Sequence, residues 1–270
     1  MSSIEFRGVT KAFAVRAEGR GVAPGRLVAL DRVDLEIPDG ELLTLVGPSG
    51  CGKSTLLDLV TGLDRPTSGE VLVADRPVTG PGLDRGIVFQ QYALFPWRTA
   101  LGNVLFGLEH LGLRRSERLR TAREHLALVG LSGFENRYPH ELSGGMKQRV
   151  AIARSLAVRP QVLLMDEPFA ALDAQTREGL QEELLRIWAD TGMTVLFITH
   201  SIEEAVYLGS RVAVMTSRPG RIKTVVDVGS GRTVADGDVR SSPEFGRYRH
   251  EVWELLHDEL SQGVGSGVRG

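Results

Sequence analysis

The most informative run of the chain is Gly47-Pro48-Ser49-Gly50-Cys51-Gly52-Lys53-Ser54-Thr55. It matches the pattern G-x-x-x-x-G-K-[ST] without a gap. The apolar run Leu42–Val46 before it predicts a buried strand, and the residues from Lys53 to a stop at Gly62 predict a helix. Glycines let backbone N–H groups surround phosphate oxygens, and a helix N-terminus adds positive potential. The run therefore predicts a nucleotide-phosphate site in which Lys53 bridges the β- and γ-phosphates and the Ser54 hydroxyl ligates Mg²⁺.

A second motif supplies acidic groups for the same chemistry. The apolar run Gln161–Met165 predicts a strand buried on both faces, and Asp166 and Glu167 follow it directly. Ligands of open α/β sheets bind at the carboxyl ends of the strands. We therefore expect Asp166 to hold Mg²⁺ through water, and Glu167 to orient or deprotonate the attacking water as a general base. The alternative interpretation is that these acids only cap the next helix.

Strand and helix patterns alternate over most of the chain, which predicts an α/β fold with a largely parallel sheet. Near the N-terminus, Ile4–Val9 and Val28–Ile37 are typical of half-buried strands. The Gly-, Ala- and Arg-rich stretch Ala14–Arg26 between them predicts a loop or a hairpin extension. A long amphipathic helix is predicted over Asp173–Thr191, with Gly192 as its stop. Further short strands are expected at Val71–Val73, Gly86–Phe89, Thr194–Thr199 and Arg211–Met215.

These patterns divide the chain into a nucleotide-binding domain, residues 1–228, and a tail, residues 229–270. Within the domain, the pattern over about 92–158 is mainly helical and is interrupted by glycines. This predicts a helical subdomain inserted into the α/β core. After Val228, a Gly/Ser-rich linker leads to an amphipathic helix near Pro243–Leu260, with Phe245, Val252, Leu256 and Leu260 on its apolar face.

Composition excludes several classes of protein. Lys and Arg number 32 against 34 for Asp and Glu, a formal net charge of −2, so no basic excess points to nucleic acid as a partner. No run approaches the roughly 18 apolar residues that span a bilayer, and the first residues lack the plan of a signal peptide. We therefore expect a soluble, cytosolic protein.

Cys51 is the only cysteine of the chain, which excludes an internal disulfide framework and is typical of a reducing compartment. Cys51 lies near Lys53 and a predicted helix N-terminus, and both a cation and a helix N-terminus lower the pKa of a nearby thiol. Cys51 is therefore either a redox-sensitive thiol or simply a small residue at a tolerant loop position.

A third glycine-rich motif narrows the family. The run Leu142-Ser143-Gly144-Gly145-Met146-Lys147-Gln148-Arg149 opens a predicted helix with Ser143 at its cap, which makes it a second anion-binding helix N-terminus. The run resembles the signature sequence of ATP-binding-cassette (ABC) ATPases. The resemblance implies a P-loop core with an antiparallel β subdomain and an inserted helical subdomain. It also implies head-to-tail pairing of two such domains, in which Ser143, Gly144 and Gly145 bind the ATP of the other domain.

The resemblance covers residues 4 to about 228 and implies roles for four more positions. Phe13 lies where the family stacks an aromatic ring on adenine, although a strand-end core phenylalanine is the alternative. Gln90, with Gln91 as a one-residue alternative, resembles the Q-loop glutamine that touches Mg²⁺ and the attacking water. Asp173 resembles the D-loop aspartate of the dimer interface. His200 resembles the switch histidine that contacts the γ-phosphate.

A finer resemblance points to the ATPase subunits of nitrate, sulfonate and taurine importers. Pro96-Trp97-Arg98 is its most telling part, because this end of the Q-loop packs on the transmembrane subunit in that group; a buried aromatic turn is the alternative. The resemblance implies a homodimer, permease subunits that contact Gln90–Arg98, a periplasmic or lipoprotein solute-binding protein, and a position at the cytoplasmic face of the membrane. The supporting runs are Gly80-Pro81-Gly82, Arg85–Gln90, Leu94–Arg98, Asn103-Val104, Leu142–Gln148 and Asp166–Asp173.

Together these motifs predict an ATP-hydrolysing, Mg²⁺-dependent subunit that powers import of a small anion or organosulfonate. The solute itself stays open among taurine or other alkanesulfonates, nitrate and a pyrimidine vitamin precursor. Two other classes are a non-transport ABC ATPase that acts on DNA or ribosomes and a nucleotide-binding regulator without hydrolysis. The single cassette and the lack of basic excess disfavour the first, and Glu167, Gln90 and His200 disfavour the second.

Overall fold

The computed structural model describes residues 2–15, 25–229 and 239–265, with side chains of the last helix described up to residue 259. The chain forms two compact units. The first unit comprises Met1–Gly82 with Met193–Gly270, and the second comprises Leu83–Gly192.

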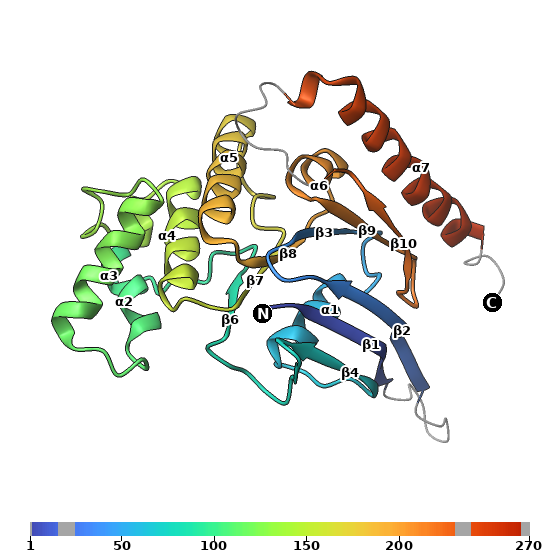
Figure 1. Ribbon diagram of the computed structural model, residues 1–270, viewed down its shortest axis with the longest axis horizontal. Helices are drawn as coiled ribbons and strands as arrows, with labels where there is room; N and C mark the ends of the chain where they lie inside the picture. Colours follow the sequence, from blue (N-terminus) through green and yellow to red (C-terminus); the bar gives the residue numbers. More distant parts are fainter. Residues whose placement is uncertain (1, 16–24, 230–238, 266–270) are drawn as a thin grey trace. The chain divides into compact units, whose positions relative to one another are not determined.

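An antiparallel sheet forms one part of the first unit (Figure 1), with its four strands in the order β2-β1-β4-β5. This confirms the expected antiparallel β subdomain. The sheet contains β1 (Ile4–Val15), β2 (Gly25–Ile37), β4 (Ser68–Val73) and β5 (Arg76–Pro77).

The pairing of β1 with β2 extends beyond the predicted strands, to Ala14 opposite Arg26 and Val15 opposite Gly25. Both ends of the stretch Ala14–Arg26 are therefore strand, and residues 16–24 lie outside the described residues. Apolar and polar residues no longer alternate in this part of the sequence, so the pattern ends before the strand does. The apolar side chains of Phe13 and Val15 are exposed here.

The phosphate loop follows the central strand of a second, mostly parallel set of strands in the same unit. The central strand β3 (Leu42–Val46) pairs in parallel with β8 (Thr194–Ile198) and with β9 (Arg211–Met215). The edge strand β10 (Ile222–Asp227) pairs antiparallel with β9. Strand β10 was not predicted, because only one of its six residues is buried and its pattern is weak. Every residue of β3 and β8 is buried, which confirms the buried strand predicted over Leu42–Val46.

Among the described residues, three α-helices complete the first unit. Helix α1 (Lys53–Thr61) follows the phosphate loop and ends at Gly62 in a left-handed conformation, as predicted. Helices α6 (Ile202–Leu208) and α7 (Pro243–Gly265) pack on one another and on β9, with the short helix η3 (Val239–Ser241) before α7. Phe245 and Val252 of α7 are buried in this core beside Val212 and Val214.

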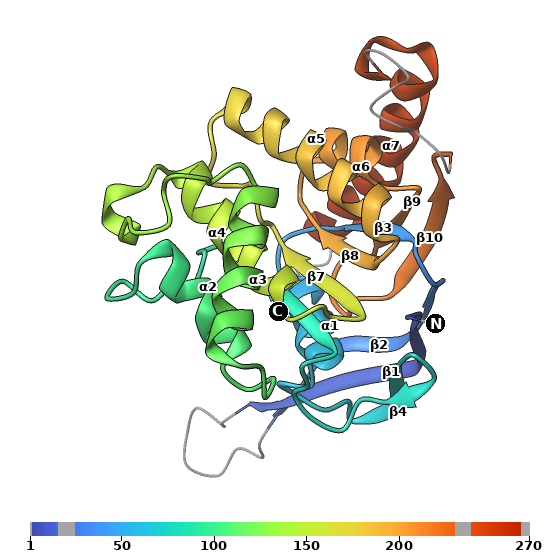
Figure 2. The same ribbon diagram turned by 60° about the vertical axis from the view of Figure 1, so that its left-hand side comes forward.

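The second unit is mainly helical. It contains the parallel strands β6 (Arg85–Val88) and β7 (Val162–Asp166). Figure 2 shows α2, α3 and α4 side by side, and each of the three packs on the other two. This confirms the inserted helical subdomain. The helices of this unit are α2 (Ala100–Leu108), α3 (Arg115–Leu128), η1 (Pro139–Glu141), α4 (Gly144–Ala157) and α5 (Ala174–Thr191).

The docking of α7 predicts a clear difference between two aromatic residues of that helix. Phe245 is 3% exposed and Trp253 is 48% exposed. Phe245→Ala should lower the free energy of unfolding by about 3–5 kcal/mol, because it leaves a cavity in the core. Urea denaturation measures this, with Trp253→Ala as the matched control. Equal losses in the two variants would contradict the described docking of α7.

Candidate active site

The backbone of the phosphate loop has the shape that its sequence predicts. It leaves buried β3 and enters α1, and Gly50 and Gly52 adopt φ values of 73° and 109°, in the left-handed region that favours glycine. Gly52 is the N-cap of α1 and offers no side-chain cap to the first turn. The N–H groups of that turn are therefore not capped by a side chain from this position, which suits an anion.

Packing also requires glycine in this loop. A Cβ on Gly52 would lie 2.7 Å from Cδ2 of Leu30 and 3.2 Å from the carbonyl oxygen of Ala29. A Cβ on Gly47 would lie 2.9 Å from Cβ of Met215. The loop backbone therefore lies directly against β2 and β9, and neither glycine can carry a side chain without a shift.

Lys53 is the buried cation of the loop. It is 8% exposed, and its Nζ donates to the carbonyl oxygens of Gly47 at 2.8 Å and Pro48 at 3.2 Å. Among the described residues Lys53 makes no ion pair, and the two carbonyls are neutral partners, so its positive charge is available to an anion. Ser54 is exposed at the next position. A buried ammonium, a glycine-lined loop and an exposed hydroxyl fit a nucleotide triphosphate with Mg²⁺.

The structure also answers the question about Cys51. The side chain is 1% exposed, and burial raises the pKa of the thiol, while nearby Lys53 lowers it by less. Sequence reasoning considered only the charges, which lower a thiol pKa, and left out the burial that outweighs them. Cys51 therefore packs as a small buried residue, and its thiol is not activated.

His200 lies at the end of β8 in a well-anchored turn. Its side chain is exposed, whereas Thr199 before it is buried. The Thr199 hydroxyl donates to Glu204, and the backbone N–H of Ser201 donates to the same hydroxyl oxygen at 3.0 Å. The Ser201 hydroxyl caps α6 by accepting from the N–H of Glu204 at 3.3 Å. The histidine is thus presented on a turn fixed on both sides.

Phe13 is an exposed residue of β1 and not part of the core. It is 40% exposed, and the ammonium of Lys11 lies 5.0 Å from the centroid of its ring. The alternative interpretation as a core phenylalanine is therefore wrong. The ring is available for stacking, and a nearby cation is compatible with its π-face.

In the second unit, Asp166 and Glu167 do not act as helix caps. Asp166 is the last residue of β7, and α5 is capped instead by Asp173, whose carboxylate accepts from the N–H of Thr176 at 3.0 Å. That hydrogen bond also lowers the pKa of Asp173. Glu167 has a φ of 45°, a strained conformation for a residue with a side chain. Such a conformation costs roughly 1–3 kcal/mol, so it persists only where the surrounding structure holds it, and residues of this kind cluster at functional sites.

The Q-loop follows β6 in the same unit. Gln90 and Gln91 are both exposed, so the structure leaves both as candidates. The next two residues, Tyr92 and Ala93, have φ values of 51° and 47°. Arg154 of α4 holds this bend, donating to the carbonyl oxygens of Ala93 at 2.6 Å and Tyr92 at 3.1 Å. Sequence reasoning missed Arg154, because nothing in a helical pattern indicates such a distant contact.

The signature glycines have a packing reason of their own. Ser143 is the N-cap of α4, as predicted, and accepts from the N–H of Met146 at 3.3 Å. A Cβ on Gly145 would lie 2.4 Å from Cγ2 of Thr176 in α5, and one on Gly144 would lie 3.2 Å from the hydroxyl of Tyr92. The signature run therefore brings the start of α4 close to α5 and leaves Ser143 exposed.

Trp97 stands out on the surface of the second unit. It is 71% exposed, so the alternative of a buried aromatic turn is wrong for this residue. Fully buried Asn103 fixes the turn: its side chain accepts from the N–H of Phe95 at 2.8 Å and donates to the carbonyl oxygens of Phe95, Arg98 and Thr99 at 3.0–3.2 Å. A rigid turn that exposes a large apolar ring is suited to a protein partner.

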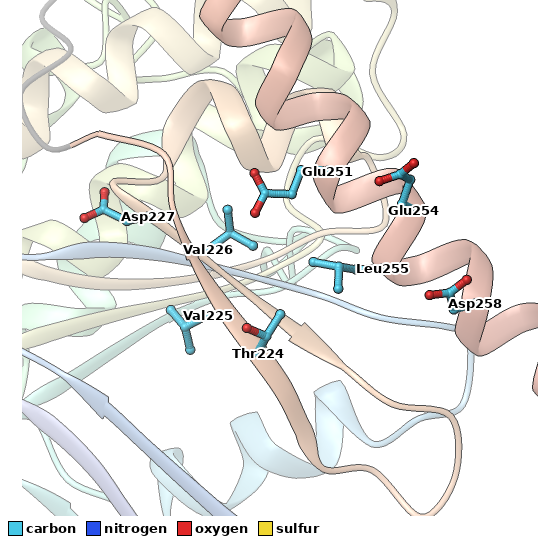
Figure 3. A pocket seen from close by; sticks show the side chains of 8 residues that line it. All are labelled: Thr224, Val225, Val226, Asp227, Glu251, Glu254, Leu255 and Asp258. Carbon is cyan, nitrogen blue, oxygen red and sulfur yellow. The ribbon is translucent and has the colours of Figure 1, made fainter.

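A cleft of about 390 Å³ between β10 and α7 is not suited to a nucleotide. Figure 3 shows its carboxylates, which come from Asp227 at the end of β10 and from Glu251, Glu254 and Asp258 on α7. These negative charges disfavour a triphosphate.

No described group of three or more His, Cys, Asp or Glu side chains is placed to hold a metal. None of the described helices meets the length and hydropathy of a membrane span.

Comparisons with known proteins agree with this geometry. Residues 30–170 match the family model described as ABC transporter. The chain is 52% identical to the nitrate import ATP-binding protein NrtD of Synechocystis sp., over 86% of this chain and 89% of that protein. It is 50% identical to the taurine import ATP-binding protein TauB of Rhizobium johnstonii, over 86% and 91% of the two chains. A dimeric ATP-binding cassette solved in a post-hydrolysis state with ADP and Pi has a TM-score of 0.70 and 35% identity, over 83% of this chain and 98% of that one.

The burial of Cys51 predicts slow alkylation. Because the thiol is buried and its pKa is raised, iodoacetamide should react at least about 100-fold more slowly with the folded chain than with the chain in guanidinium chloride. Cys51 is the only cysteine, so mass spectrometry reports it without ambiguity. Equal rates in the folded and denatured chains would show that the thiol is accessible.

Proposed function

The chain belongs to the ABC transporter family as one of its ATP-binding ATPases, and we propose that it powers the import of a small anion, nitrate or an organosulfonate such as taurine. The phosphate loop with buried Lys53 is the observation that carries the ATPase role. The class of solute is supported by the likeness to the nitrate and taurine import proteins over most of the chain.

We propose that Lys53 binds the β- and γ-phosphates of ATP and that Ser54, Gln90 and Asp166 hold Mg²⁺. The exposed hydroxyl of Ser54 and the half-buried carboxylate of Asp166 are oxygen donors, which Mg²⁺ prefers. When bound, Mg²⁺ neutralises part of the charge on the phosphates. Mg²⁺ is usually bound through one or two carboxylates together with substrate phosphates and water, which is the division of roles proposed here.

Glu167 is proposed as the general base that takes a proton from the attacking water. The oxygen of that water forms a bond to the γ-phosphorus as the bond to the β–γ bridging oxygen breaks, which leaves ADP and phosphate. His200, exposed on its anchored turn, would donate a hydrogen bond to the γ-phosphate. Phe13, also exposed, would stack on the adenine ring.

A second copy of the chain is the proposed partner that completes each ATP site. Ser143 is exposed at the N-terminus of α4, and the solved cassette relative is a dimer. We propose that Ser143 and Gly145 of one copy bind the γ-phosphate held by the other, with Asp173 at the interface between the copies.

Permease subunits are the proposed partners of the turn that carries Trp97, and a solute-binding protein would deliver the anion to them. The support is the exposed tryptophan on a turn fixed by Asn103. With such partners the ATPase works at the cytoplasmic face of the membrane.

The assigned general base gives the first test. Glu167→Gln keeps the size of the side chain and removes its basicity, so ATP binding should persist while turnover falls by about 10²–10⁴-fold. Calorimetry measures binding, and phosphate release measures turnover. Glu182→Gln, at an exposed position of α5, is the matched control. Full turnover in Glu167→Gln would refute the assignment of Glu167.

The importer role is tested with the complete complex reconstituted in proteoliposomes. The measurement is ATP-driven uptake of labelled taurine or of nitrate. Trp97→Ala should reduce ATP-driven uptake by about tenfold, while ATP binding by the isolated chain stays unchanged, because the ring is mostly exposed and is not part of the phosphate loop. Tyr138→Ala, also at an exposed position of the second unit, is the control. Uptake of neither anion by the wild-type complex would overturn the solute class, and unchanged uptake with Trp97→Ala would overturn the docking site.

A further inference from the structure

The turn between β9 and β10 lies against the phosphate loop. The N–H of Gly220 donates to the carbonyl oxygen of Ala29 at 2.8 Å, and the N–H of Asp31 donates to that of Gly220 at 3.0 Å. A Cβ on Gly220 would lie only 2.0 Å from the carbonyl oxygen of Cys51. The turn is thus tied to β2 on one side and packed on the phosphate loop on the other.

Arg218 of this turn holds one peptide group of the phosphate loop. Its Nε and Nη2 donate to the carbonyl oxygen of Gly50 at 3.1 and 3.0 Å. In a trans peptide the carbonyl and the next N–H point in opposite directions, so this contact also fixes the N–H of Cys51. That N–H turns inward and donates to the carbonyl oxygen of Pro48 at 3.3 Å. Arg218 therefore sets the orientation of a peptide within the loop that we assign to the phosphates.

Glu259 of α7 holds the residue before Arg218. This carboxylate is 7% exposed; its Oε2 accepts from the backbone N–H of Ser217 at 3.1 Å, and its Oε1 lies 3.0 Å from Nζ of Lys223 in β10. Lys223 also donates to the carbonyl oxygen of Leu255 at 2.9 Å. Figure 3 shows the neighbouring residues Leu255 and Asp258 on α7 and Thr224 on β10. A buried carboxylate keeps its partners, because breaking these contacts would leave a buried charge unpaired, which costs free energy.

We propose that Arg218 is a positioning residue for ATP binding, and that Glu259 of the C-terminal helix supports it through Ser217. The proposal rests on the ATP-binding role proposed above. Helix α7 thereby influences the affinity of the phosphate loop for ATP through one hydrogen bond to Ser217 and two to Gly50.

Arg218→Ala in the full-length chain is the first test. The two hydrogen bonds that Arg218 donates to Gly50 are exposed, so the Tm of the variant without nucleotide should differ from that of the wild type by less than about 2 °C. The Kd for Mg·ATP, measured by calorimetry, should rise by on the order of tenfold, and the KM for ATP in steady state should rise with it while kcat stays within about twofold. Arg218→Lys should recover part of the affinity, because an ammonium still donates one hydrogen bond. Arg120→Ala, at an exposed arginine of α3, is the control.

The coupling of Glu259 in α7 to Arg218 is tested by a double-mutant cycle. Glu259→Gln should raise the Kd for ATP by a smaller factor than Arg218→Ala, because the amide oxygen still accepts from Ser217 while the charge that pairs with Lys223 is lost. If Glu259 acts through Arg218, the double variant should bind ATP no more weakly than Arg218→Ala alone. Glu254→Gln, exposed on the same helix, is the control.

The outcomes separate this inference from the proposed function. A wild-type chain that does not bind ATP overturns both. A wild-type chain that binds ATP, with an unchanged Kd in Arg218→Ala, overturns the role of Arg218 alone. Strictly additive effects of Arg218→Ala and Glu259→Gln overturn the coupling of Glu259 to Arg218. A raised Kd and KM for Arg218→Ala, partial recovery with Arg218→Lys and a non-additive double variant support the proposal.

Discussion

The shape of the phosphate loop depends on close backbone packing against segments that are distant in the sequence. Gly220 leaves no room for a Cβ beside the Cys51 carbonyl, and Gly52 leaves none beside Leu30. The left-handed residues Gly50 and Gly52 therefore lie in a loop that is packed against β2 on one side and the turn after β9 on the other. Within this loop Lys53 is buried and Ser54 is exposed. Catalysis by phosphoryl transfer relies on such preorganised charge more than on covalent chemistry by the protein.

Features set by neighbouring residues in the sequence are the ones that sequence reasoning predicts well. The stops at Gly62 and Gly192 and the N-cap Ser143 lie where the pattern places them, and the long helix predicted from Asp173 begins one residue later, with Asp173 as its N-cap. Each of these depends on the intrinsic properties of one residue and its neighbours within a turn. The family motifs are predictable for the same reason, since each is a short continuous run.

Features set by distant contacts are not visible in the pattern. Arg218, Arg154 and Asn103 act on backbone carbonyls of other segments, and an arginine or asparagine carries no sign of its partner in a single sequence. The thiol of Cys51 shows a related limit, because its charged neighbour is visible in the sequence and its burial is not. Strand pairing at Val15 likewise continues where its side chain is exposed, and only the backbone ladder reveals it.

If the turn after β9 supports the phosphate loop of this ATPase, Gly220→Ala should disturb ATP binding. The measurement is the Kd for Mg·ATP of folded protein, with Gly246→Ala as the control, because a Cβ on Gly246 meets no atom within 4 Å. Gly220→Ala should bind ATP at least about tenfold more weakly than the wild type, while Gly246→Ala should bind as the wild type does. Equal affinity of Gly220→Ala and the wild-type chain would contradict this role of the turn.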